Sequence, residues 1–233
     1  MADRHIVAMG GGGFLMEGAE SLLDAYVLAL TDRPNPRVCY LGTAMGDAAA
    51  HIVGFYRAFP LERADATHLA LFERDGRDPR DHLLAQDVVY VGGGNTVNML
   101  AVWRAHGVDA ALREAWEAGV VLCGMSAGSL CWFEAGVTDS YGPLRPLHDG
   151  LGLLPGSHCP HYDGEAERRP TYRRAIADGL PPGIAADDCC ALHFSGTELV
   201  EVVASRPDAC AYRVEPGPLG AVETPIAARF LGA

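Results

Sequence analysis

A serine between two glycines is the residue of this sequence with the clearest capacity for chemistry. Ser126 lies in GMSAG at 124–128, after an apolar, β-branched run at 119–123 and before a segment that can be helical. A strand, a tight turn and a helix in this order are the setting of a nucleophile elbow. There the serine backbone is strained, and the residues two before and two after it must be nearly free of side chain. The pattern predicts Ser126 as a nucleophile, although G-x-S-x-G alone is a weak signal.

A second glycine-rich turn could supply hydrogen-bond donors to such a nucleophile. The strand-like run at 87–91 leads into GGGNT at 92–96, where three glycines let the backbone turn sharply before a helix. A tetrahedral oxyanion needs two preorganised donors. We expect the backbone amide of Ala127 to supply one donor, and the amide of Gly93 or Gly94 to supply the other. A plain strand-to-helix turn is the alternative.

A histidine would be the base, and the chain contains nine. His161 has the most distinctive context, because Pro160 fixes the backbone just before it and a Gly- and Pro-rich loop at 151–157 precedes the segment. His158 is the nearby competitor. Asp139, in a polar loop, is one candidate for the acid that orients the imidazole, although an aspartate that caps a turn is more common.

The elements that would position these residues alternate along the chain. Strand-like runs and helical patterns follow one another at the spacing of an α/β protein with a mainly parallel sheet. Strands are expected near 5–9, 37–42, 87–91, 119–123, 184–194 and 198–203. Helices are expected near 18–31, 47–58, 80–85, 95–105, 108–117, 128–133 and 166–178. Short antiparallel strands should follow from about residue 209, and the absence of a linker or repeat predicts one domain over 1–233.

Four glycines at 10–13 follow the first expected strand and superficially resemble a dinucleotide-binding turn. The G-x-G-x-x-G continuation is missing, and the next strand ends in Thr43 instead of an acidic residue. We therefore expect a close-packed active-site loop at 10–13 in preference to a nucleotide site.

Composition limits the partners and the compartment. The formal net charge of -12 argues against nucleic acid and anionic membrane, because both bind cationic patches. No charged and apolar leader and no run of ~18 apolar residues is present, so a cytoplasmic location is expected. The seven cysteines form no C-x-x-C pair and mostly lie in apolar runs, which indicates reduced core residues and neither a disulfide framework nor a zinc site.

Three motifs together carry a resemblance. GGGNT at 92–96, GMSAG at 124–128 and CPHYD at 159–163, in this order, resemble the peptidase E or aspartyl dipeptidase family of serine peptidases, S51, which is related to the cyanophycinases. The likeness extends from the first strand to about Val203. It implies a three-layer α/β/α sandwich similar to class I glutamine amidotransferases, with a serine nucleophile, a histidine base, and no cofactor or metal.

The resemblance also implies a third catalytic residue, an acid near the start of a later strand, which is typically glutamate. Matching residues 184–188 to that segment puts Asp188 at the acid position, with Asp187 one residue away. An aspartate is shorter by one methylene, so the backbone must bring it closer to the imidazole. In α/β-hydrolases the acid precedes the histidine, an order that Asp139, the second choice, would restore.

The activity that the resemblance implies is hydrolysis of small peptides through an acyl-enzyme. Family members that cleave Asp-X dipeptides need a cation, for which Arg168 or Arg169 is a candidate, while an exposed charged helix start is the alternative. Asn95 is a further substrate-binding candidate.

Two alternative functions and the oligomeric state also have to be considered. One is a homologue without Asp-X dipeptidase activity, with another substrate or a binding or regulatory role. A glutamine-amidotransferase-like enzyme is disfavoured, because the elbow carries a serine and not a cysteine. A homodimer is compatible with the sequence, which does not decide the oligomeric state.

Overall fold

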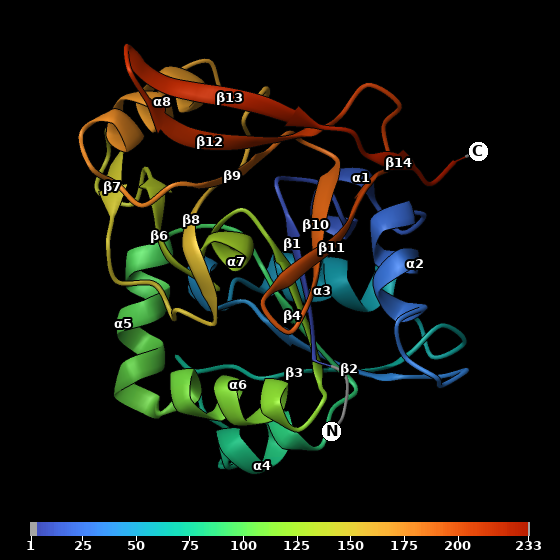
Figure 1. Cartoon of the computed structure of the whole chain (residues 1–233). Helices are drawn as coiled ribbons and strands as arrows, with labels where there is room; N and C mark the ends of the chain where they lie inside the picture. The colour runs from blue at the N-terminus through green and yellow to red at the C-terminus, as the bar shows by residue number, and fades with distance from the viewer. Residues whose placement is uncertain (1–3, 233) are drawn as a thin grey trace.

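An eight-stranded mixed sheet lies at the centre of the protein (Figure 1). The computed structural model describes residues 4–232. The parallel part of the sheet consists, in spatial order, of β1 (His5–Met9), β5 (Val121–Met125), β4 (Val88–Val91), β2 (Arg37–Leu41) and β3 (Asp65–His68). Beyond β1 the sheet continues with β10 (Cys190–Ser195), β11 (Glu198–Ala204) and β14 (Arg229–Phe230); β10 is antiparallel to both neighbours.

Helices cover both faces of this sheet. On one face, Val7 and Met9 of β1 pack with the helices α1 (Phe14–Glu17), α2 (Leu22–Leu28) and α3 (Ala49–Ala58). On the other face, Ile6 and Ala8 pack with α4 (Pro79–Leu84), α5 (Thr96–His106) and α6 (Val108–Glu117). Burial on both faces explains why the parallel strands read as continuous apolar runs. The predicted three-layer α/β/α sandwich with a mainly parallel sheet is confirmed.

A second, six-stranded sheet was not predicted. It consists, in spatial order, of β13 (Gly220–Ile226), β12 (Ala211–Gly217), β9 (Gly183–Ala186), β8 (Leu154–Cys159), β6 (Phe133–Thr138) and β7 (Arg145–Leu147). The helix α8 (Arg168–Ala177) packs on one side of it, as Figure 1 shows near the top of the molecule.

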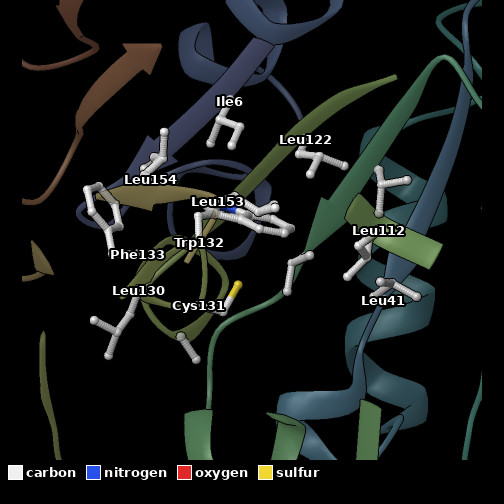
Figure 2. Close-up of a cluster of buried hydrophobic side chains, with 14 of the residues drawn as sticks. Ile6, Leu41, Leu112, Leu122, Leu130, Cys131, Trp132, Phe133, Leu153 and Leu154 are labelled. Carbon is white, nitrogen blue, oxygen red and sulfur yellow. The ribbon is translucent and has the colours of Figure 1, made fainter. Parts of the chain in front are cut away.

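The two sheets share a hydrophobic core. Figure 2 shows Ile6 and Leu122 of the central sheet in one cluster with Trp132, Phe133 and Leu154, which lie in or next to strands of the second sheet. Trp132 is completely buried, although its indole Nε1 has no hydrogen-bond partner among residues 4–232. The chain between α7 (Ala127–Leu130) and β6 therefore joins the two sheets.

Four expected elements differ in the structure. The helix expected at 128–133 ends at Leu130, because β6 begins at Phe133. The helix expected at 18–31 is shorter, since α2 begins at Leu22 and ends at Leu28; Gly18, with φ 78, ends the separate helix α1 before it. The strand expected over 184–194 is two strands, β9 and β10, in different sheets. The C-terminal β12–β13 hairpin is antiparallel as predicted, but β14 runs parallel to β11.

The carboxyl ends of the parallel strands lie at one edge of the central sheet. Met9 pairs with Met125, and Val91 pairs with Leu41 and Gly124, so β1, β5, β4 and β2 end in register. The turns that follow them therefore meet at the edge where open α/β sheets bind ligands.

Five of the seven cysteines lie in the protein interior. Cys39, Cys123, Cys131, Cys159 and Cys190 are buried, and burial raises the pKa of each thiol. Among residues 4–232, no helix has the length and apolar character needed to cross a bilayer.

Candidate active site

The turn between β5 and α7 has the backbone of a nucleophile elbow. Ser126 adopts φ 55 and ψ -116, a conformation that costs a non-glycine residue about 1–3 kcal/mol. A Cβ at Gly124 would lie 2.5 Å from the carbonyl oxygen of Gly128, and a Cβ at Gly128 would lie 2.2 Å from that of Val91. Both glycines are therefore required for the close approach of strand and helix, as the sequence predicts.

A buried histidine contacts the turn at Ser126 through Ser129. The Ser126 carbonyl oxygen accepts a hydrogen bond from the Ser129 hydroxyl at 2.8 Å, and that hydroxyl lies 3.1 Å from Nε2 of His158. Nδ1 of His158 donates to the Ile184 carbonyl at 2.7 Å. Burial lowers the pKa of His158 to about 4, so its ring is neutral near pH 7. His158, the competitor for the base, is fully buried within the core.

The glycine turn at 92–94 lies against the elbow. A Cβ at Gly93 would be 2.6 Å from Sδ of Met125 and 3.2 Å from Cβ of Ser126. The Ser126 amide already donates to the Met9 carbonyl at 3.2 Å. Among residues 4–232, no acceptor is paired with the amides that the sequence predicts as oxyanion donors, those of Gly93, Gly94 and Ala127.

His161 and Asp188 form a direct hydrogen bond. Nδ1 of His161 lies 2.6 Å from Oδ1 of Asp188, and the side chains are 13% and 19% exposed. His161 follows β8 and has φ 55, and its amide donates to the Gly10 carbonyl at 3.1 Å. Asp188 lies in the turn between β9 and β10, where Cys189 has φ 65. Left-handed backbone at Ser126, His161 and Cys189 is thus concentrated in one small region.

Two glycines enclose the Asp188 carboxylate. A Cβ at Gly11 would lie 2.1 Å from its Oδ1, and a Cβ at Gly164 would lie 2.0 Å from its Oδ2. The loop at 10–13 therefore closely approaches the paired His161 and Asp188, as expected of a close-packed loop at this site.

Asp163 accepts a hydrogen bond from the backbone of Asp188. It was not singled out as a site residue from the sequence, although it belongs to CPHYD. Its Oδ1 accepts the Asp188 amide at 2.8 Å, and its Oδ2 pairs with Arg206. Burial opposes ionisation of Asp163, but these two contacts outweigh it and lower the pKa of the carboxyl. Asp163 is therefore an anionic anchor for the turn that carries Asp188.

The two alternative acids have other partners. Asp187 is 4% exposed, its Oδ2 accepts the Cys210 amide at 3.1 Å, and burial raises its pKa. Asp139 is exposed, with Oδ1 3.8 Å from Nη2 of Arg168. Within residues 4–232, neither carboxylate forms a hydrogen bond with His161, whereas Asp188 does.

Ser126 and His161 line the same cavity, of about 220 Å³. Its other lining residues are Leu15, Met16, Met45, His51, Gly93, Gly94 and Met125. A larger cavity of about 420 Å³ lies between β7 and α8 and contains neither Ser126 nor His161. Met16, Met45 and His51 were not singled out in the sequence, because only the folded chain brings them beside the serine.

The sequence of the chain shows which protein family it belongs to. The chain matches the sequence profile of "Peptidase family S51" over residues 6–202. The chain belongs to peptidase family S51. This membership confirms both the resemblance found in the sequence and the expectation of a serine peptidase.

Named relatives of this S51 peptidase are also peptidases. The "Uncharacterized peptidase YgaJ" of Bacillus subtilis (strain 168) is 49% identical over 230 residues, which cover 98% of this chain and 100% of that protein. The "Peptidase E" of Shewanella denitrificans is 33% identical over 132 residues, which cover 52% of this chain and 56% of that protein.

Solved structures show the same fold at low sequence identity. A peptidase from an acI-B1 Actinobacterium has a TM-score of 0.71 and 18% identity, covering 97% of this chain and 95% of that one. A putative peptidase E from Listeria monocytogenes EGD-e has a TM-score of 0.64 and 18% identity, covering 87% of this chain and 99% of that one.

The residues expected to bind substrate in this S51 peptidase have partners within the chain. Asn95 caps α5, accepting from the Asn98 amide at 2.8 Å and donating to the Ser140 carbonyl at 2.9 Å. Arg168 is 3% exposed and donates to Glu165 at 2.7 Å. Arg169 pairs with Glu223 at 2.9 Å. Their role in substrate binding stays a prediction.

Proposed function

We propose that this chain hydrolyses small peptides by a Ser126, His161 and Asp188 triad. The observation that supports the triad best is the 2.6 Å hydrogen bond between His161 and Asp188, beside a cavity that Ser126 and His161 both line. An imidazole that donates from Nδ1 to a carboxylate keeps Nε2 unprotonated and able to accept the serine proton.

The proposed reaction proceeds through an acyl-enzyme. His161 takes the Ser126 proton through Nε2 while the Ser126 oxygen attacks the peptide carbonyl, and Asp188 stabilises the imidazolium that forms. The free amides of Ala127 and of Gly93 or Gly94 would hold the oxyanion. His161 then protonates the leaving amine, and water hydrolyses the ester by the same steps.

The substrate is proposed to be short, in the range of a dipeptide. A cavity of about 220 Å³ is smaller than the pockets of about 300–1,000 Å³ that enclose drug-sized ligands. Asp-X dipeptides require a cation at the site, so Arg168 or Arg169 would have to exchange Glu165 or Glu223 for the substrate. These pairings favour the second candidate function, a family member without Asp-X activity. The homodimer and the cytoplasmic location stay predictions.

A serine-directed probe tests the triad independently of the substrate. We expect a fluorophosphonate to label the wild-type chain and Ser195→Ala, a control serine at the end of β10, but not Ser126→Ala. In a dipeptide library, Ser126→Ala should lower kcat by roughly 10⁶-fold, as removal of the nucleophile does in subtilisin. Unchanged labelling or hydrolysis in Ser126→Ala would refute the proposal, and a wild type that neither labels nor hydrolyses would favour a binding role.

A further inference from the structure

Hydrophobic side chains form a large part of the walls of the Ser126 cavity. Four of its lining side chains are hydrophobic: Leu15, Met16, Met45 and Met125. We propose that this cavity binds an apolar side chain, on the substrate residue whose carbonyl Ser126 attacks. The inference rests on the proposed function and specifies its substrate class.

The methionines are positioned around the reacting groups. Met125 directly precedes Ser126, and its Sδ lies 2.6 Å from where a Cβ of Gly93 would be. Sδ of Met16 accepts the Gly12 amide at 3.1 Å, which fixes this side chain to the active-site loop. Met16 and Met125 therefore both contribute apolar surface to the cavity that Ser126 lines.

Two of these methionines expose surface that a substrate could cover. Met16 is 49% exposed and Met45 is 46% exposed. Apolar side chains gathered in one cavity lose contact with water when another apolar group enters, which favours binding of that group. Met16 and Met45 therefore favour a hydrophobic occupant.

The charges of the chain oppose an acidic occupant. The sequence contains no lysine, and the residues around the cavity, all within 4–232, include no arginine. An aspartate side chain placed among methionines without a cation would lose hydration and gain no ion pair. The formal net charge of -12 adds a long-range repulsion of anions.

His51 is the polar lining residue that could favour a different occupant. Its Nδ1 is buried and has no hydrogen-bond partner among residues 4–232. One ring nitrogen forms a single hydrogen bond and lacks the two-pronged contact that a guanidinium makes with a carboxylate. His51 therefore holds a carboxylate side chain less well than a guanidinium would.

Methionine walls also predict broad acceptance. Met is unbranched and has three rotatable bonds, so it adapts its shape to different apolar groups. Substrates with Leu, Met or Phe at this position should therefore be cleaved with similar kcat/KM.

A dipeptide series with one common second residue tests the inference. We expect kcat/KM for Met-Leu, Leu-Leu and Phe-Leu to exceed that for Asp-Leu and Asn-Leu by at least about 10-fold, the size of effect that one missing apolar contact produces. Met45→Arg should raise kcat/KM for Asp-Leu and lower it for Met-Leu. Leu61→Gln, at an exposed apolar residue outside the cavity, is the matched control and should change neither.

The outcomes separate this inference from the proposed function. Faster cleavage of Asp-Leu than of Met-Leu by the wild type would overturn the apolar pocket while leaving the triad intact. So would a His51→Gln variant that loses cleavage of Asp-Leu alone. A chain that cleaves no dipeptide and is not labelled at Ser126 refutes the proposed function and the apolar pocket together. Circular dichroism melts of each variant confirm that it is folded.

Discussion

Nδ1 of His161 lies 2.6 Å from Oδ1 of Asp188, although different strands position the two residues. His161 follows β8 of the second sheet, whereas Asp188 lies in the turn that leads from β9 of the second sheet to β10 of the central sheet. Because β8 and β9 are adjacent and parallel, with Cys159 paired to Ala185, both residues follow the same edge of the second sheet.

Replacing the acid tests its role. Asp188→Asn should lower kcat by roughly 10⁴-fold with little effect on folding, because an amide that donates to Nδ1 stabilises the wrong imidazole tautomer. Asp139→Asn, at the exposed alternative, should leave kcat within about twofold of the wild type. Steady-state kinetics on the best dipeptide measure both. The reverse pattern, loss in Asp139→Asn alone, would assign the acid to the 139 loop.

A methyl group at Gly11 should damage catalysis more than stability. Its Cβ would lie 2.1 Å from Oδ1 of Asp188 and 3.1 Å from Nδ1 of His161, so the carboxylate must move away from the imidazole. We expect Gly11→Ala to lower kcat at least about 10²-fold, the usual cost of a misplaced catalytic group. Gly54→Ala, inside α3, is the control, since its Cβ would lie 3.9 Å from Phe14. It should gain about 0.5–1 kcal/mol of stability and keep its activity.

A methyl group at Gly128 should reduce stability more than catalysis. Its Cβ would lie 2.2 Å from the Val91 carbonyl oxygen, which is backbone of a central strand and cannot rotate away. Overpacking of this kind costs about 1–3 kcal/mol or more. Urea unfolding of Gly128→Ala should show this loss, and an unchanged midpoint would mean that the elbow tolerates a side chain there.

The parts of the site that were predictable from the sequence depend on local patterns. The pattern that predicts Ser126 consists of a strand, two glycines and a helix, all within ten residues. The buried parallel strands are recognisable as continuous apolar runs. The strands β1, β2, β4 and β5 and the turn at Ser126 were therefore predicted, whereas the edge strands β3 and β14 of the central sheet were not.

The parts that were missed depend on distant pairing. β6 and β8 contain Gly136 and Pro155, which weaken a strand pattern, and they form a sheet only by pairing with each other and with β9. The choice between Asp187 and Asp188 depends on the turn before left-handed Cys189, in which Asp187 accepts the Cys210 amide while Asp188 contacts His161. Met16, Met45 and His51 come from different turns, so their spacing in the sequence gives no sign that they share a cavity.

Asp24 should make stability depend on pH. Its carboxyl is fully buried, its Oδ1 accepts from the Tyr90 hydroxyl at 3.0 Å, and its Oδ2 has no partner among residues 4–232. Burial raises the pKa of Asp24 from 3.8 to about 7. Between these values the unfolded chain releases a proton that the folded chain keeps. The contribution of Asp24 to stability is therefore full below about pH 4 and is lost as the pH rises to about 7.

Asp24→Asn removes this titration, so the free energy of unfolding of the variant should rise relative to the wild type between pH 4 and pH 7. Each pKa unit corresponds to about 1.4 kcal/mol, which makes the expected change a few kcal/mol. Burial lowers the pKa values of His158 and His193 to about 4, so their contributions to protein stability decrease as the pH falls. These contributions are the same in the wild type and the variant and cancel in the difference. Urea unfolding at several pH values measures that difference. A constant difference across this range would show that Asp24 has the same pKa in the folded and unfolded chains.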